Sequence, residues 1–368
     1  MNFTPTQSAA IKKIVAWVRS RSGPQVMRMF GYAGTGKTTL ARQIADEVPG
    51  TLFGAFTGKA SLVLRQKGCS SARTIHSMIY KSRFDEITGA AAYNWNPDSD
   101  VAGATLVCID EVSMVGPDLG KDLLRYGTKV LVLGDPAQLP PVNGEGFFID
   151  GTPDIMLTEV HRQAAENPII AMSMTVRTGG RLVPGEYGAS RVIRRADLGQ
   201  AAMREIVMSA DQMLVGRNAT RTTFNGRVRE IRFGTKDPAP RQGDKLVCLR
   251  NNHLTGLLNG GLWTVAREPS LVGDAWAMRV ESLDEEGVTL DVSTHAAYFD
   301  GTQADLNWKT RRKQDEFTYG YALTVHKSQG SSWPHVLVVD ESSAFREHAA
   351  NHLYTALTRA SDRVTVVV

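Results

Sequence analysis

Cysteine is scarce in this sequence. The 368 residues include only three cysteines, Cys69, Cys108 and Cys248, which are widely spaced and odd in number. A disulfide framework or a zinc site needs cysteines in closely spaced or paired positions. We therefore expect neither of these, and we expect the protein to reside in a reducing cytoplasm.

Long hydrophobic runs are also missing. No apolar stretch approaches the roughly 20 residues that a membrane-spanning helix needs, and Met1–Ala10 lacks the basic-then-apolar order of a signal peptide. The sequence contains no internal repeat and no low-complexity tract. Hydrophobic residues make up 42% and charged residues 22%, which is ordinary for a globular protein. We expect two or three domains and no membrane partner.

Basic residues are slightly in excess, and some of them cluster. The net charge is +4 and the pI is about 8.9. Arginines gather at 217–232, and a mixed lysine and arginine group lies at 309–313. Each group could be an ordinary solvated surface or a contact for a polyanion, and composition leaves both alternatives open.

Short apolar runs rich in β-branched residues recur along the chain, and each ends in a polar or glycine-rich turn. They are Gln25–Phe30, Thr51–Phe56, Thr105–Ile109, Lys129–Leu133, Gln212–Val215, Phe317–Leu323, His335–Val339 and Arg363–Val368. Such runs are typical of strands buried on both faces of a parallel sheet. Helices are expected between them, such as Lys37–Val48 and Pro117–Tyr126, so the pattern predicts two doubly wound α/β units.

Two segments depart from this pattern. Lys81–Pro97 has polar and aromatic arms around a Thr-Gly pair and predicts a β-hairpin. Residues from about 233 to 311 alternate in polarity between turn signals, which indicates a small all-β insertion.

One glycine-rich segment predicts a phosphate-binding loop. Gly31–Thr38 (GYAGTGKT) matches the pattern G-x-x-x-x-G-K-[ST] between an expected strand and an expected helix. Its glycines allow backbone N–H groups to surround phosphate oxygens, and a helix N-terminus favours negative charge. We expect Lys37 to reach the β- and γ-phosphates of ATP and the Thr38 hydroxyl to ligate Mg²⁺.

Polar side chains follow two more of the expected strands. Asp110 and Glu111 come directly after 105–109, and Gln138 lies in the turn after 129–133. An Asp-Glu pair alone would more often be an acidic helix start. With the phosphate loop upstream, it predicts ATP hydrolysis, with Asp110 at the metal, Glu111 as the base that activates water and Gln138 as a sensor of the γ-phosphate.

These blocks, with others in the same order, resemble the superfamily 1 helicases, and more closely the branch of the RecD subunit, the Dda helicase of T-even phages and the Pif-type helicases. The blocks similar to family motifs are Phe3–Gln7 (Q motif), Thr57–Ala60 (Ia), Thr74–His76 (Ib), Asp110–Met114 (II), Gly134–Pro141 (III), Leu157–Gln163 (IV), Tyr321–Gly330 (V) and Tyr354–Ala360 (VI). Together they extend over nearly the whole chain, and their common order is far more specific than any single block.

The resemblance implies an α/β fold of two RecA-like P-loop NTPase domains that carry two insertions. Domain 1A would comprise residues 1–77 and 104–156, with a 1B hairpin, or pin, at 78–103. Domain 2A would comprise 157–232 and 312–368, with an SH3-like β-barrel, 2B, inserted at 233–311.

The resemblance also implies that both RecA-like domains contact the nucleotide. Arg162 and Arg359 would reach the γ-phosphate from domain 2A as arginine fingers and join Lys37, Glu111 and Gln138 in catalysis. The residues implied around ATP are Gln7, Gly31, Ala33, Gly34, Thr35, Gly36, Lys37, Thr38, Thr39 and Gly330, with Thr38 and Asp110 at Mg²⁺. Hydrolysis would open the cleft and shift the two domains along a bound strand.

The implied DNA contacts are to phosphate and sugar, which carry no sequence preference. They are Thr57, Lys59, Thr74, His76, Pro140, Thr324, His326 and Ser328. Lys59 is expected to make the largest contribution to the salt dependence of binding. Phe84, Tyr93 and Trp95 of the hairpin have two alternative roles: stacking on the last base pair of a duplex, or packing the hairpin onto domain 1A.

The function implied by the resemblance is that of a monomeric ATP-dependent DNA helicase that moves 5′ to 3′ on single strands and acts at single-strand/duplex junctions. An RNA-directed motor and a non-motor nucleotide-dependent scaffold are the alternatives, and the two arginine positions disfavour the scaffold. A single-stranded-DNA-binding protein or a replisome component would be a further partner. The location would be the cytoplasm, or the host cytoplasm for a phage protein, and replication, recombination and repair all stay open.

Overall fold

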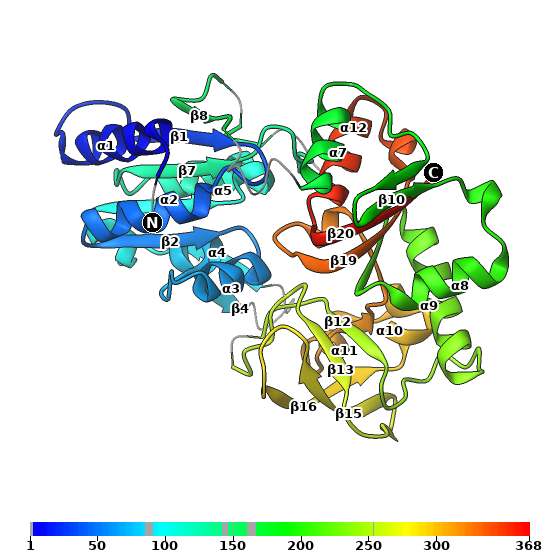
Figure 1. Ribbon diagram of the computed structural model, residues 1–368. Coiled ribbons are helices and arrows are strands. Elements are labelled where there is room, and N and C mark those ends of the chain that lie inside the picture. Colours follow the sequence, from blue (N-terminus) through cyan, green and yellow to red (C-terminus); the bar gives the residue numbers. More distant parts are fainter. Residues whose placement is uncertain (1–2, 85–90, 142–145, 150, 160–166, 253) are drawn as a thin grey trace.

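The computed structural model describes residues 3–84, 91–141, 146–149, 151–159, 167–252 and 254–368. Figure 1 shows three lobes: a first lobe coloured blue to cyan, a second coloured green and red, and a third coloured yellow to orange. Within the described residues, each lobe is built on a six-stranded sheet.

The first lobe has a parallel sheet with the order β3-β2-β6-β7-β1-β8. Its strands are β1 (Val26–Gly31), β2 (Thr51–Ala55), β3 (Arg73–Thr74), β6 (Leu106–Asp110), β7 (Val130–Gly134) and β8 (Ile155–Leu157). Because parallel strands end at the same edge of a sheet, the segments after Gly31, Asp110 and Gly134 meet there.

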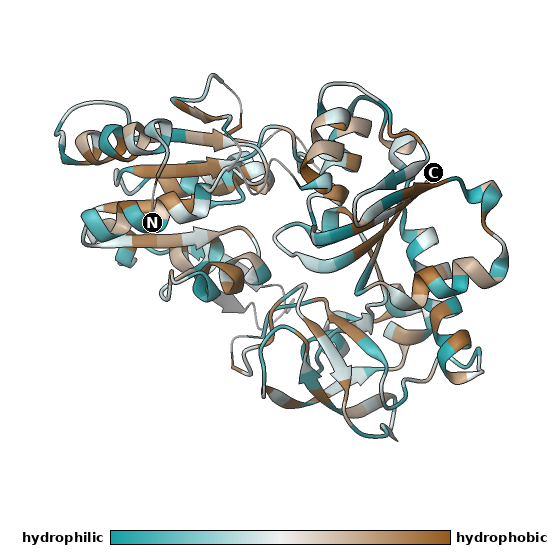
Figure 2. Cartoon of the chain, in the orientation of Figure 1, coloured by the Kyte–Doolittle hydropathy of each residue, from teal (hydrophilic) through white to brown (hydrophobic). Residues whose placement is uncertain are grey.

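Helices cover both faces of this sheet. They are α1 (Pro5–Arg19), α2 (Lys37–Glu47), α3 (Gly58–Gln66), α4 (Ile75–Ile79) and α5 (Pro117–Leu124), with short 3₁₀ turns η1 (Asp100–Gly103) and η2 (Val112–Met114). Met29 and Leu131 face the core under α1 and α2, whereas Phe30 and Val130 face the core under α4 and α5. This alternation requires strands that are hydrophobic on both sides, and Figure 2 shows hydrophobic colouring on them.

The second lobe has a sheet with the order β18-β11-β19-β20-β10-β9, parallel except for the β9–β10 pair. Its strands are β9 (Gly185–Tyr187), β10 (Ser190–Ile193), β11 (Gln212–Val215), β18 (Ala322–Thr324), β19 (Trp333–Val339) and β20 (Ala360–Val367). Its helices are α7 (Pro168–Arg177), α8 (Gln200–Ser209), α9 (Asn218–Phe233) and α12 (Ala349–Leu357), with 3₁₀ turns η3 (Arg195–Asp197), η5 (His326–Ser328) and η6 (Ser342–His348). The expected α/β class with parallel central sheets is confirmed.

The third lobe is an antiparallel sheet inserted in the sequence between α9 and β18. Its strands are β12 (Lys245–Cys248), β13 (Leu262–Val265), β14 (Ser270–Val272), β15 (Ala275–Ser282), β16 (Thr289–His295) and β17 (Phe317–Tyr319). Two short helices, α10 (Ala297–Asp300) and α11 (Trp308–Arg312), and a 3₁₀ turn, η4 (Gln303–Asp305), precede β17. Trp263 and Phe317 lie in its core.

The prediction of a single strand at Phe317–Leu323 is wrong. β17 pairs with β12 of the third lobe, whereas β18 pairs with β11 of the second. Gly320 joins the two strands, and a Cβ there would lie 2.9 Å from the Leu246 carbonyl carbon. The third sheet therefore continues to Tyr319, beyond the limit of 311 that the resemblance implied. At the other boundary, Leu157 pairs within the first sheet, not the second.

Both arms of the expected hairpin lie within the described part of the chain. β4 (Tyr80–Phe84) pairs antiparallel with β5 (Ala91–Trp95), and the residues between them lie outside the described part of the chain. Across the described segments, no helix combines the length and apolar character needed to cross a membrane.

A buried ion pair joins α9 to the third lobe. Arg229 Nε lies 3.0 Å from Asp244 Oδ1, and the two side chains are 4% and 0% exposed. Arg229 also donates to the carbonyl of Asp237 at 2.7 Å, and the Tyr321 hydroxyl donates to the Asp244 carboxylate at 2.9 Å. Both charges are therefore satisfied within the protein.

Replacing Arg229 with Ala is expected to lower the free energy of unfolding by about 3–5 kcal/mol, because the Asp244 carboxylate would stay buried without its cation. Urea unfolding would measure the change. Arg279→Ala is the matched control, since Arg279 pairs with an exposed carboxylate, Asp291, and should cost under about 1 kcal/mol. Equal losses in the two variants would contradict the assignment.

Candidate nucleotide site and nucleic-acid surface

The loop that joins β1 to α2 forms one wall of a cavity of about 390 Å³. Gly34 and Gly36 have φ angles of 78° and 81°, a left-handed conformation that glycine adopts without strain. Gly31 is required by space, because a Cβ there would lie 2.6 Å from Thr35 Oγ1. The loop lines the cavity beside the N-terminus of α2, a position that favours an anionic ligand.

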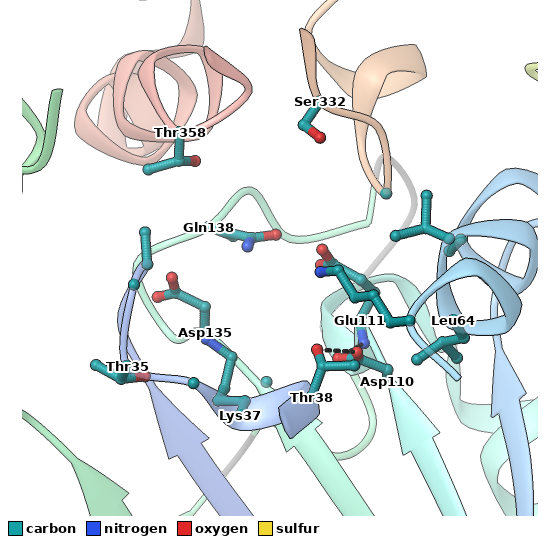
Figure 3. A pocket seen from close by; sticks show the side chains of 18 of the residues that line it. Thr35, Lys37, Thr38, Leu64, Asp110, Glu111, Asp135, Gln138, Ser332 and Thr358 are labelled. Atoms are coloured by element: carbon teal, nitrogen blue, oxygen red, sulfur yellow. Dashed lines mark hydrogen bonds between the residues drawn. The ribbon is translucent and has the colours of Figure 1, made fainter. Parts of the chain in front are cut away.

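Two functional side chains of α2 lie at its first turn. Lys37 Nζ donates to the carbonyls of Gly31 and Tyr32 at 2.6 and 3.1 Å. The Thr38 hydroxyl donates to Asp110 Oδ2 at 2.9 Å (Figure 3). A hydroxyl and a carboxylate side by side are a donor set that suits Mg²⁺. Thr38 and Asp110 are therefore the residues that would hold the metal.

Glu111 occupies a strained position at the end of β6. Its φ is 54°, which costs a residue with a side chain about 1–3 kcal/mol and is typical of functional sites. Burial raises the pKa of the Glu111 carboxyl, and the Arg359 guanidinium partly opposes this increase. A carboxylate with a raised pKa is a stronger base near neutral pH, as activation of water requires.

The second lobe completes the cavity. Ser332 and Thr358 lie across from the phosphate loop in Figure 3. Arg359 is 6% exposed, and its Nη1 lies 3.8 Å from Glu111 Oε1 of the first lobe. Its Nε donates to the Thr355 carbonyl at 3.2 Å, so the guanidinium is fixed to the second lobe while it faces the first.

The remaining expected nucleotide residues differ in position. Gln138 lines the cavity, and its Oε1 is buried with no hydrogen-bond partner in the described part of the chain. Gln7 is buried beside the loop, and its Nε2 donates to the Thr35 carbonyl at 3.2 Å. Gly330 lines the cavity from the second lobe. Arg162 lies outside the described residues.

The structure brings most of the expected nucleotide residues together at one cavity. Those that line it are Ala33, Gly34, Thr35, Gly36, Lys37, Thr38, Thr39, Asp110, Glu111, Gln138, Gly330 and Arg359. Asp135, which sequence reasoning missed, also lines it and lies inside the Gly134–Pro141 block. Val63 and Leu64 of helix α3, and Lys67 directly after it, also line the cavity, and no local pattern in the sequence signals this.

On the first lobe, three of the expected DNA contacts are engaged within the protein. The Thr57 and Thr74 hydroxyls cap α3 and α4, where each accepts a backbone N–H. Lys59 is 9% exposed, and its Nζ lies 2.5 Å from Asp284 Oδ1 of the third lobe. In this structure Lys59, the cation expected to bind a DNA phosphate, is therefore paired with a carboxylate of the protein itself.

The hairpin aromatics separate into different environments. Tyr93 is 58% exposed, and its ring centroid lies 6.1 Å from that of His76. Trp95 is half-buried, and its Nε1 donates to the Asp122 carbonyl of α5 at 3.1 Å. The side chain of Phe84 lies outside the described part of the structure. Trp95 therefore packs the hairpin onto the first lobe, whereas Tyr93 is accessible to a base.

The expected contacts of the second lobe also differ. The His326 ring centroid lies 5.7 Å from that of Phe345, and burial lowers the pKa of the imidazole. Thr324 is half-buried, as is Pro140, which the first lobe contributes. Ser328 is fully buried, and its hydroxyl donates to a backbone carbonyl at 2.7 Å. Ser328 thus stabilises a turn and is not open to a strand.

Comparisons with known proteins agree with this architecture. Residues 2–197 match the model of a family described as an AAA domain, and residues 319–367 match the UvrD-like helicase C-terminal domain. The ATP-dependent RecD2 DNA helicase of Deinococcus radiodurans is 30% identical over 368 residues, which cover 93% of this chain and 47% of that protein. The chain belongs to the RecD and Pif branch of the superfamily 1 helicases.

Other members of this branch are similar over most of the chain. The ATP-dependent DNA helicase Pif1 of Bdellovibrio bacteriovorus is 24% identical, with 90% of this chain and 80% of that protein covered. The crystal structure of Bacteroides Pif1 bound to ssDNA has the same fold, with a TM-score of 0.57, 17% identity, and coverage of 99% and 92% of the two chains. This RecD- and Pif-like chain spans half or less of the first curated relatives, 47% and 31% of their lengths.

Replacing Glu111 with Gln should leave nucleotide binding intact and lower the rate of ATP turnover at least about 100-fold, because an amide cannot accept the proton of water. Activity of the unmodified protein should fall as the pH decreases through the raised Glu111 pKa, closer to neutrality than for an ordinary carboxyl. Steady-state hydrolysis and nucleotide binding would be measured in parallel, with Glu47→Gln on the exposed end of α2 as control. Near-normal turnover by Glu111→Gln would place the base elsewhere.

Proposed function

We propose that this chain is an ATP-dependent DNA helicase that translocates on single-stranded DNA and unwinds duplexes. The observation that carries the proposal is the approach of Arg359 on the second lobe to Glu111 on the first, across the cavity lined by the phosphate loop. A site built from both lobes is complete only when the lobes come together. ATP turnover would therefore change how the two lobes are placed relative to each other. The relatives are named as ATP-dependent DNA helicases, which supports a DNA substrate.

Four side chains at the cavity, and Arg162, have a proposed part in hydrolysis besides the two that would hold the metal. Lys37 and Arg359 neutralise charge on the transferring phosphoryl group. The Thr38 hydroxyl and the Asp110 carboxylate would hold Mg²⁺, which would supply further charge neutralisation. Glu111 accepts the proton of the attacking water, and Gln138 senses the γ-phosphate. Arg162 is proposed as a second arginine finger on the resemblance alone.

The three lobes and the β4–β5 hairpin are proposed to correspond to the four parts of the related helicases. The two parallel sheets would be RecA-like domains 1A and 2A, and the third lobe would be the SH3-like 2B insertion. The hairpin β4–β5 would be the 1B pin, with Tyr93 as its base-stacking residue, because that ring is exposed and stacking on bases is independent of sequence.

The single strand is proposed to cross both parallel-sheet lobes. Thr57, His76 and Tyr93 would contact it from the first lobe, and Thr324 and His326 from the second. The two sets approach each other where α3 meets the segment after η5, since a Cβ on Gly330 would lie 2.8 Å from Ala60 Cβ. Thr74 and Pro140 are retained as minor contacts, and the 5′-to-3′ direction follows from the resemblance.

Lys59 would bind phosphate only after it leaves Asp284. Asp284→Asn keeps an oxygen to accept the N–H of Leu262, which the aspartate accepts at 2.9 Å, but removes the charge that holds Lys59. We expect a several-fold, roughly 3- to 10-fold, gain in affinity for single-stranded DNA and a log–log salt slope steeper by about 0.7, the value for one phosphate contact on single strands. Fluorescence anisotropy at several salt concentrations would measure both.

The control for this variant is Asp291→Asn, which removes an exposed carboxylate from the same lobe and should leave binding unchanged. An unchanged affinity and slope in Asp284→Asn would show that Lys59 does not contact the strand.

The proposed activity is tested by unwinding of matched duplexes with a 5′ or a 3′ single-stranded tail. We expect ATP-dependent unwinding of the 5′-tailed duplex only. Lys37→Ala should abolish turnover and unwinding because the phosphates lose their cation, whereas Lys12→Ala, at an exposed position of α1, should retain both. Unwinding of the 3′-tailed duplex alone would show the opposite polarity. Absence of DNA-stimulated ATP turnover would refute the proposed function.

A further inference from the structure

The hydroxyl of Tyr354 lies where segments of both lobes meet. The backbone N–H of Ala33, in the phosphate loop, donates to it at 3.0 Å. The hydroxyl in turn donates to Asp135 Oδ2 at 2.7 Å. Tyr354 belongs to α12 of the second lobe, whereas both partners belong to the first. A single hydroxyl therefore links the lobes beside the phosphate loop.

Burial determines the direction of these hydrogen bonds. The Tyr354 side chain is among the largest that are fully buried, at 1% exposure. Burial and the adjacent Asp135 carboxylate raise the pKa of the phenol well above its usual range. The group therefore stays protonated at neutral pH and donates to a charged acceptor, which makes this bond stronger than one between neutral groups.

Asp135 connects this hydrogen bond to the turn that carries Gln138. Its second oxygen, Oδ1, accepts the Ala137 N–H at 3.0 Å, and its carbonyl accepts the Gln138 N–H at 3.1 Å. The Asp135 side chain thus bonds both the Tyr354 hydroxyl and the backbone of this turn. Displacing that side chain would move the Gln138 amide at the cavity.

Helix α12 holds the same turn at two further points. Leu139 is buried in the core of the second lobe, and its N–H donates to Thr355 Oγ1 at 2.9 Å. Asn351 Nδ2 donates to the Ala137 carbonyl at 3.1 Å. The helix then leads directly to Arg359, whose Nε donates to the Thr355 carbonyl. One helix therefore contacts the phosphate loop, the Gln138 turn and the arginine.

We propose that Tyr354 is a positioning residue for ATP hydrolysis, whose hydroxyl holds the phosphate loop, the Gln138 turn and the helix before Arg359 in one arrangement. The inference rests on the ATPase activity proposed above. Tyr354 lines a neighbouring cavity of about 250 Å³ and acts through the groups that line the nucleotide cavity. Loss of the hydroxyl therefore slows the chemical step more than it weakens nucleotide binding, to which Lys37 contributes directly.

Tyr354→Phe removes the hydroxyl and keeps the buried ring. At saturating single-stranded DNA, kcat for ATP should fall about 10- to 100-fold, the scale expected for losing a hydrogen bond to a charged group. KM for ATP should change less than about threefold, because Tyr354 does not itself line the nucleotide cavity. Steady-state kinetics would measure both constants.

Tyr319→Phe is the matched control. It removes another buried hydroxyl, which donates to the Pro238 carbonyl in the third lobe at 2.6 Å, and it should keep the kcat of the unmodified protein. An unchanged kcat in Tyr354→Phe, or equal decreases in kcat in the two variants, would overturn the proposal.

A second variant covers the case in which Tyr354→Phe is unstable. Asp135→Asn keeps the shape but leaves one acceptor oxygen for two donors, the Tyr354 hydroxyl and the Ala137 N–H, so kcat should also decrease. The decrease in kcat of the double variant should be smaller than the product of the two single decreases, because both changes act on the same network of hydrogen bonds. Multiplicative losses would contradict the proposal. If the unmodified protein shows no ATP turnover with any DNA, the proposed function fails, and this inference fails with it.

Discussion

The approach of Arg359 to Glu111 is the contact on which the arrangement of the site depends. Arg359 Nη1 and Glu111 Oε1 are 3.8 Å apart. The Arg359 guanidinium donates to a backbone carbonyl of the second lobe, whereas Glu111 belongs to the first lobe and has a left-handed backbone conformation. The distance between Arg359 and Glu111 therefore depends on how the two lobes are placed relative to each other. An electrostatic interaction of this kind is strong only in a buried site.

One loop at the boundary between the lobes contacts both of them. Leu139 leaves the first lobe and is buried in the core of the second, where its carbonyl accepts from Gln329 at 3.0 Å. Gln138 precedes it and faces the nucleotide cavity. The amide proposed to sense phosphate is thus adjacent in sequence to a residue anchored in the other lobe. The Tyr354 hydroxyl links the lobes at the same turn through its hydrogen bond to Asp135. The lining of the nucleotide cavity and the contact between the lobes are therefore formed by neighbouring residues of one loop.

The third lobe contributes to this relation by contacts with α3. Asp284 holds Lys59 through an ion pair, and its carbonyl accepts from Gln66 at 2.9 Å. The same helix contributes Val63 and Leu64 to the nucleotide cavity. One helix therefore lies between the cavity and the third lobe, and it carries the cation expected to meet DNA. A strand that reaches Lys59 has to replace a protein carboxylate with a phosphate.

Local sequence determined the parts of the site that short segments form by themselves. The loop Gly31–Thr38 needs glycine for its left-handed positions, and Asp110 and Glu111 follow a strand whose apolar run is visible in the sequence, so these residues and the parallel sheets could be predicted from spacing alone. Trp95, Ser328 and Lys59 could not be assigned in the same way, because motif similarity describes residue type and leaves burial undetermined. Their side chains pack on α5, close a turn and pair with Asp284, respectively.

Contacts between residues far apart in the chain were decided only by tertiary structure. The two strands within 317–323 read as one apolar run, and only pairing with β12 and β11 separates them. Tyr354 is unremarkable in sequence beside Arg359, yet its hydroxyl meets Ala33 and Asp135 across the lobe boundary. Sequence by itself determined which chemical groups are present and on which elements. The packing of the lobes decided which groups meet, because hydrogen bonds and ion pairs depend on distances that no local pattern sets.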